Sequence, residues 1–116
     1  MAKREAKKDV VINELVSKLY SIIRSMEEGS ETSIGRLVAR ILMSRGYENH
    51  WLDGKHGNGW TKDGGKTFAI TDEDLFDILD KTDIALKDDV ELDFSKYENM
   101  IVGLPYCLEF TVRHKK

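Results

Sequence analysis

The sequence predicts an α+β domain in which two antiparallel N-terminal helices, a β-hairpin and a short third helix precede a mostly antiparallel C-terminal sheet. Three observations lead to this prediction: apolar residues recur at helical spacing in the first half, glycines gather in the middle, and apolar and polar residues alternate near the end. At 116 residues, with 41% hydrophobic side chains, the chain is long enough to bury one core without disulfides. We therefore expect a single domain over residues 1–116, with the element order ααββαβββ.

The first helix is expected to follow a flexible basic tail, residues 1–8, and to end before Gly29. Its apolar residues cover one face of the helix over an arc of about 140°. These residues are Val11, Ile12, Leu15, Val16, Leu19, Ile22, Ile23 and Met26. A two-layer domain can cover only part of such a wide apolar face. We therefore also expect the chain to form dimers or larger homo-oligomers.

The second helix is expected after residues 30–33, which offer several N-cap candidates, and Gly46 is expected to end it. One face carries an apolar stripe at helical spacing: Ile34, Leu37, Val38, Ile41 and Leu42. Arg36 and Arg40 lie opposite that stripe, on the face expected to be exposed. The two helices should form an antiparallel pair across a short turn.

Residues 47–65 are expected to be loop, because five of the nine glycines fall there together with Trp51 and Trp60. At the end of this segment we expect a β-hairpin. Its strands would be residues 60–61 and 66–70, and the sequence Lys-Asp-Gly-Gly between them supplies the positive φ that tight turns need.

The third helix is expected to start at a capping box formed by Thr71 and Asp74, and to bury one apolar face. That face would carry Leu75, Phe76, Ile78 and Leu79. Three strands follow, at residues 90–94, 100–103 and 106–113. In the last strand alternation predicts a shared face for Tyr106, Leu108, Phe110 and Val112.

Several catalytic and nucleotide-binding motifs are incomplete. Gly65-Lys66-Thr67 matches the end of a phosphate-binding loop, but Trp60 stands where that motif needs its first glycine. No Gly-x-Ser-x-Gly elbow is present, and Cys107 lies in a predicted strand with no catalytic signature around it. We therefore expect no enzyme activity and no cofactor.

Metal-binding motifs are incomplete as well. The candidate zinc ligands lack close paired spacing: His50, His56, His114 and Cys107. In the segment from Asp53, Lys55 and Gly57 occupy positions where a calcium loop needs oxygen ligands. We expect no metal site. A site at the turn that uses Asp53 and His56 remains an open alternative.

The expected location is the cytoplasm. A lone cysteine cannot form an internal disulfide, which suits a reducing compartment. The basic N-terminus has no apolar segment behind it of the kind found in signal peptides, and no apolar run is long enough to cross a membrane.

Charge is distributed unevenly along the chain, and this asymmetry carries the functional hypothesis. The whole chain has a net charge of −3, whereas residues 71–99 carry eleven acidic residues against three lysines. We expect a small non-enzymatic binding or accessory protein that engages a protein partner, or itself, through the Gly-rich aromatic loop and this acidic surface. The candidate contact residues are Trp51, Trp60, Asp72, Asp77 and Asp80.

Two alternatives remain open. A nucleic-acid-binding module resembling a winged helix would use Arg36 and Arg40 on the second helix and Lys62 and Lys66 on the hairpin. Two observations speak against it: a glycine-rich loop follows the second helix, and a phosphate-binding domain is expected to be basic. The other alternative is a small-molecule site under the loop of residues 47–60.

Overall fold

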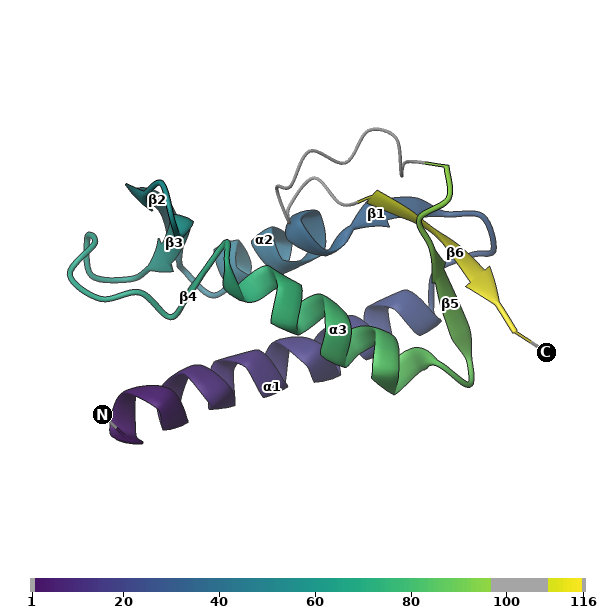
Figure 1. Cartoon of the computed structure of the whole chain (residues 1–116), viewed down its shortest axis with the longest axis horizontal. Helices are drawn as coiled ribbons and strands as arrows, with labels where there is room; N and C mark the ends of the chain where they lie inside the picture. The colour runs from purple at the N-terminus through teal and green to yellow at the C-terminus, as the bar shows by residue number, and fades with distance from the viewer. Residues whose placement is uncertain (1, 97–108, 116) are drawn as a thin grey trace.

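A computed structural model describes residues 2–96 and 109–115, with side chains from Lys8 onward. Its three helices are α1 (Ala2–Arg24), α2 (Ile34–Ser44) and α3 (Asp74–Leu86). Its strands are β1 (Glu31–Ser33), β2 (Glu48–Asp53), β3 (Gly57–Thr61), β4 (Ile70–Thr71), β5 (Val90–Asp93) and β6 (Glu109–His114). The predicted α+β class is confirmed, and α2 runs back in the opposite direction to α1 (Figure 1).

The strands form two antiparallel three-stranded sheets at opposite ends of the helices (Figure 1). One sheet has the order β1-β6-β5, so that β6 lies between a strand near residue 32 and a strand near residue 91. The other sheet has the order β2-β3-β4 and is built from consecutive strands. This second sheet is inserted between α2 and α3.

Helix α1 begins at Ala2, within the stretch of residues 1–8 for which the sequence predicted a flexible tail. Alanine, lysine, arginine and glutamate dominate this stretch, and all four have high helix propensity. At its end Lys8 Nζ lies 3.3 Å from the carboxylate of Asp74, at the start of α3. The N-terminal turns of α1 therefore extend past the part of the helix that packs into the core.

The predicted turn between the first two helices contains strand β1. Ser33 at the end of that strand is the N-cap of α2, and its Oγ accepts a hydrogen bond from the backbone N of Arg36 at 3.2 Å. One of the predicted cap candidates is thus the cap. The strand itself depends on pairing with β6, in which Thr32 lies opposite Phe110.

The predicted hairpin is correct in one contact and wrong in its turn. Trp60 does pair with Ile70, but residues 62–69 form a longer connection and β4 has only two residues. The shorter hairpin connects β2 to β3, so residues 47–65 are not simply a loop. At its turn the carboxylate of Asp53 accepts hydrogen bonds from the backbone N of Lys55 and of His56.

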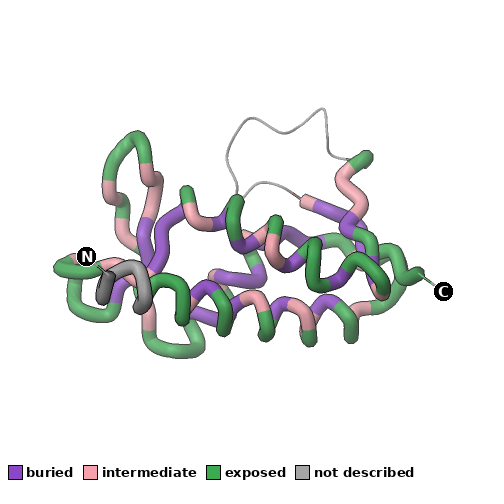
Figure 2. The backbone as a smooth tube through the Cα atoms, turned by 60° about the horizontal axis from the view of Figure 1, so that its bottom comes forward, coloured by how far each residue is buried: buried purple, intermediate pink, exposed green. Residues whose placement is uncertain are grey.

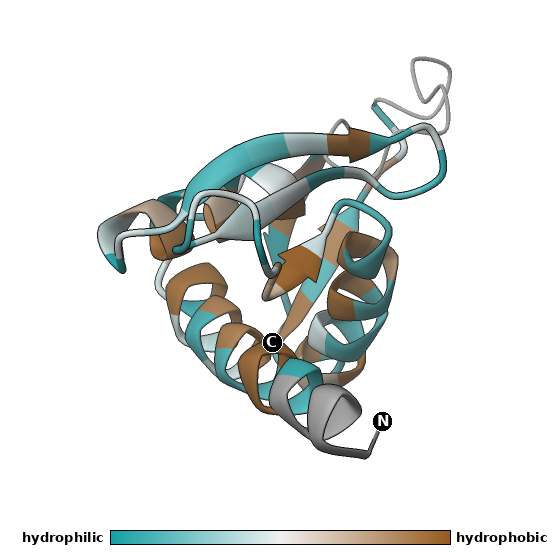
Figure 3. Cartoon of the chain, turned by 90° about the vertical axis from the view of Figure 1, so that its left-hand side faces the viewer, coloured by the Kyte–Doolittle hydropathy of each residue, from teal (hydrophilic) through white to brown (hydrophobic). Residues whose placement is uncertain are grey.

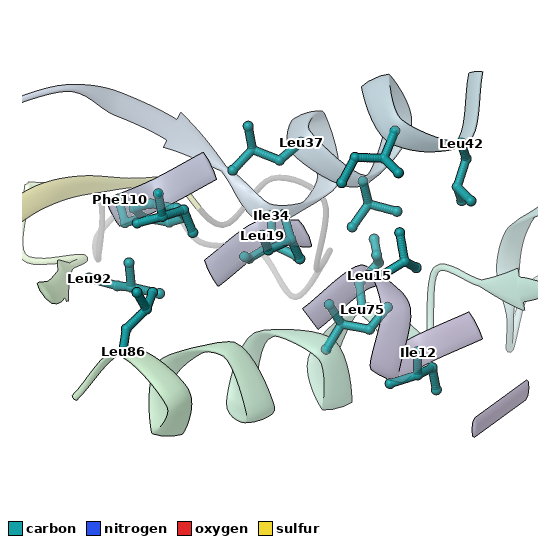
Figure 4. Packing of buried hydrophobic residues seen from close by; sticks show 14 of the residues in the cluster. Ile12, Leu15, Leu19, Ile34, Leu37, Leu42, Leu75, Leu86, Leu92 and Phe110 are labelled. Atoms are coloured by element: carbon teal, nitrogen blue, oxygen red, sulfur yellow. The ribbon is translucent and has the colours of Figure 1, made fainter. Parts of the chain in front are cut away.

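One hydrophobic cluster fills the space between the helices and the sheet β1-β6-β5. It runs from Phe110 and Leu92 at one end, past Leu19 and Ile34, to Leu75 (Figure 4). Along the helices buried positions alternate with exposed ones at helical spacing (Figure 2), and the hydrophobic parts of α1 and α3 face each other (Figure 3). The predicted apolar stripe of α2 is fully buried.

The buried face of α3 differs from the predicted apolar face. On α3 the buried positions are Leu75, Ile78, Thr82 and Leu86. Phe76 points away from them and is 44% exposed, so its placement in the core was wrong. The predicted strand at residues 100–103 and Cys107 lie outside the described residues.

Candidate protein-binding surface

The two tryptophans proposed as contact residues have opposite environments. Trp60 is in the middle strand of its sheet, between Asn49 and Ile70, and only 8% of it is exposed. Trp51 is in β2, an edge strand among those described, and is 68% exposed. Trp60 is therefore buried and presents little surface to a partner, whereas Trp51 is accessible.

Asp72 is also buried and does not belong to the exposed acidic surface. Its Oδ2 accepts a hydrogen bond from the backbone N of Asn58 at 2.9 Å, and its own backbone N donates to the carbonyl oxygen of Asn58 at 2.8 Å. Burial raises the pKa of the Asp72 carboxyl, and the hydrogen bond from Asn58 opposes this only in part. Asp72 thus joins the sheet β2-β3-β4 to the start of α3.

This joint also determines how far Trp51 lies from the start of α3. Trp51 lies opposite Asn58 in the register of β2 and β3, and Asn58 is bonded to Asp72 on its other side. Neighbouring strands are about 4.8 Å apart, so the backbones at Trp51 and Asp72 are about 10 Å apart. The exposed indole therefore belongs to β2, which β3 separates from Asp72 and the start of α3.

The exposed side of α3 combines acidic and large apolar side chains. Phe76 is 44% exposed and Ile84 is 67% exposed. We call this side the α3 face, and its residues are Phe76, Asp77, Asp80, Asp83 and Ile84. Asp77 forms an ion pair with Lys81 at 3.2 Å, while no ion pair involves Asp80 or Asp83 within the described ranges. The predicted acidic contacts Asp77 and Asp80 are thus accessible together with two apolar groups.

Sequence reasoning missed Phe76 and Ile84 as surface residues. The signal was present in the helical period: a buried stripe through Leu75, Ile78 and Thr82 leaves positions 76 and 84 out of phase by about 100° or more. Short apolar runs hide this, because Phe76 directly follows a core residue in sequence.

The four basic residues of the nucleic-acid hypothesis have mixed roles. Arg36 forms an ion pair with Glu109 at 3.2 Å, and the Nζ of Lys62 lies 4.7 Å from the ring centroid of Tyr47. Arg40 is exposed on α2, and Lys66 is exposed in the connection between β3 and β4. Two of the four are therefore engaged within the molecule.

Neither a metal site nor a ligand pocket occurs at the turn and loop of residues 47–60, within the part of the chain that is described. His56 Nδ1 lies 3.0 Å from both carboxylate oxygens of Asp53. Among the residues described, no group of three His, Cys, Asp or Glu side chains is arranged to hold a metal ion. A hollow does occur in the described surface along the outside of α1, away from the loop of residues 47–60, and Ser17, Ser21 and Arg45 help to line it.

None of the described helices has both the length and the apolar content to cross a membrane. Comparison of the chain with protein-family models, with curated proteins and with solved structures gave no match. The geometry of the surface is therefore the basis for assigning a function.

Proposed function

We propose that this chain is a small non-enzymatic binding protein whose α3 face receives a protein partner. The observation that carries the proposal is the exposure of Phe76 and Ile84 among three exposed aspartates, on a helix whose other side is anchored in the core. Large apolar side chains exposed beside charged ones are typical of protein-interaction sites. Trp51, exposed on β2 of the adjoining sheet, is a further candidate contact residue.

The two kinds of side chain would contribute differently. Covering Phe76 and Ile84 removes apolar area from water and is worth about 1.5–3 kcal/mol for each side chain that becomes fully buried. The aspartates add little affinity at the rim, but they favour a basic partner and accelerate its approach. We therefore expect a partner with an apolar patch flanked by Lys or Arg, and an association rate that falls with salt.

The test is affinity capture from a lysate of the source organism, with the whole chain as bait and three variants beside it. Ile84→Glu and Asp80→Lys change the α3 face, and Glu91→Lys makes the same charge reversal on exposed β5. We expect the wild type and Glu91→Lys to retain the same protein, and the two α3 variants to lose it. Equal capture by all four baits of a protein other than this chain, or turnover of a substrate by the purified chain, contradicts the proposal.

A nucleic-acid-binding module is the second candidate, because one topological observation favours it. Without β2–β4 the element order is helix–strand–helix–helix–strand–strand, and the sheet order β1-β6-β5 is that of winged-helix domains. In that arrangement α3 would be the recognition helix, yet its exposed aspartates would repel phosphates. This is why the candidate ranks second.

Fluorescence anisotropy with labelled duplex and single-stranded DNA tests the second candidate. Binding at low salt that weakens in Arg40→Ala and Lys66→Ala would favour it. No anisotropy change at low salt would exclude it.

A further inference from the structure

We propose that the partner of the α3 face is a second copy of this chain, which contributes the outer face of α2. This inference rests on the proposed function and names the partner. Its basis is that the two helices expose side chains of opposite charge, each set accompanied by a large apolar group. The outer face of α2, called the α2 face below, consists of Arg36, Arg40 and Met43.

The α2 face is accessible and only partly neutralised. Met43 is 64% exposed, and the side chain of Arg36 is 71% exposed although it contacts Glu109. Arg40 is exposed, and it makes no ion pair with any carboxylate in the part of the chain that is described. Gly35 and Ala39 beside these residues are small, so a second helix can approach the backbone of α2 closely.

The spacing of the two faces matches when the helices are antiparallel. The first and last residues of the α2 face, Arg36 and Met43, are seven positions apart, and so are Phe76 and Asp83 of α3, with Arg40 and Asp80 between them. At a rise of 1.5 Å per residue both distances are about 10.5 Å.

An antiparallel contact therefore brings together three pairs: Met43 with Phe76, Arg40 with Asp80, and Arg36 with Asp83. A thioether beside an aromatic ring is a favourable contact, and Ile84 would lie against the aliphatic stem of Arg36. The apolar pair supplies most of the affinity, because exposed ion pairs contribute at most about 1 kcal/mol each. The ion pairs determine which faces meet.

The contact is heterologous, since it joins one face of a copy to a different face of the next. Contacts of this kind form rings or chains rather than a single closed pair, unless the geometry closes after two copies. We expect the average mass of the assemblies to rise with protein concentration and to fall as salt is added.

Sedimentation velocity on the whole chain, from about 1 μM to about 1 mM and at two salt concentrations, tests the inference. We expect Asp80→Lys and Arg40→Glu each to weaken self-association about tenfold or more, and the double variant to regain it. Lys66→Glu and Glu91→Lys are controls of matched charge on exposed positions outside both faces. Circular dichroism checks that every variant is folded.

Three outcomes overturn the inference: a monomer at every concentration, equal loss in the control variants, or failure of the double variant to regain association. In the capture experiment, a bait altered on its α3 face still carries the α2 face and can retain wild-type copies of this chain, so only the capture of other proteins is compared there. With that condition the capture experiment separates this failure from that of the proposed function. If the chain is monomeric but captures another protein through its α3 face, only the identity of the partner is wrong. If neither occurs, both proposals fail.

Discussion

Asn58 and Asp72 hold the inserted sheet to α3 through two hydrogen bonds: the Asn58 backbone N donates to the Asp72 carboxylate at 2.9 Å, and the Asp72 backbone N donates to the Asn58 carbonyl oxygen at 2.8 Å. One of them uses a carboxylate that is buried and has a raised pKa. The position of the hairpin relative to the α3 face therefore depends on an acid that burial penalises in its charged form.

Replacing Asp72 by Asn is expected to leave the free energy of unfolding at pH 7 unchanged or higher. The amide oxygen can still accept from Asn58, and no charge is buried. The folded protein binds the Asp72 proton more tightly than the unfolded chain does, so the wild type gains stability as pH falls through its raised pKa towards 3.8. Urea unfolding between pH 3.5 and 7 should show this gain in the wild type and not in Asp72→Asn.

Asp72→Ala is the complementary variant, because it removes the acceptor as well as the charge. It should lose about 1–2 kcal/mol through the unpaired N–H of Asn58. Equal stability of the Ala and Asn variants would contradict a role for that hydrogen bond.

Gly57→Ala is expected to destabilise the protein more than Gly64→Ala. Both glycines have positive φ, +75° and +74°, so each substitution carries the same backbone strain of about 1 kcal/mol. A Cβ at Gly57 would also lie 2.7 Å from Oδ2 of Asp72, whereas a Cβ at Gly64 would meet nothing within 4 Å. Thermal unfolding of the pair measures the cost of the clash alone, and equal melting temperatures would refute it.

Asp63→Ala is expected to loosen the connection between β3 and β4 and to lower the melting temperature. The Asp63 carboxylate accepts hydrogen bonds from Oγ1 and the backbone N of Thr67, and another from Oγ1 of Thr61. These hydrogen bonds hold the pKa of Asp63 far below its ordinary value of 3.8.

This contribution to stability from Asp63 is present above pH 3.8 and is lost as pH falls towards the lowered pKa. The melting temperature of the wild type should therefore fall below pH 4 more steeply than that of Asp63→Ala. Asp88→Ala, at an exposed position, is the control. Parallel acid profiles for the wild type and Asp63→Ala would contradict the assignment.

The two tryptophans offer a direct comparison of core and surface. Trp60→Ala should cost about 3–5 kcal/mol, since it empties a buried site, whereas Trp51→Ala should cost less than about 0.5 kcal/mol. Chemical denaturation followed by circular dichroism measures both. In the capture experiment Trp51→Ala should weaken binding without changing stability.

The helices were predictable because a periodic apolar pattern needs only local sequence. The buried stripe of α2 and the alternation of Val90 and Leu92 in β5 were predicted residue by residue. The predicted face of α1 contains all four of its buried residues, Ile12, Leu15, Leu19 and Ile23, and four that are only partly buried. Strand β1 was not found, because three residues carry no period and its partner Phe110 is far along the chain. Strand β2 was missed for a related reason: it is an edge strand with mostly polar residues.

For the candidate surface, the sequence predicted only that its charge is negative. The excess of acidic residues in 71–99 is visible in the sequence. The sequence does not show which of these residues are buried, as Asp72 is in its contact with Asn58, and which are exposed on the surface. Asp72 and Asp80 are chemically identical, and the pairing of β3 with β4 buries one of them. The same pairing decides that Trp60 is buried and Trp51 is exposed.

The central place of β6 in its sheet has a consequence for biosynthesis. Both β1 and β5 pair with β6, so neither has its partner until residues 109–114 have been synthesised. The sheet β2-β3-β4 uses neighbouring segments and can form earlier. On the ribosome we expect the apolar side chains that pack against the sheet β1-β6-β5 to stay exposed until these residues emerge, and chaperones could bind the nascent chain during that time.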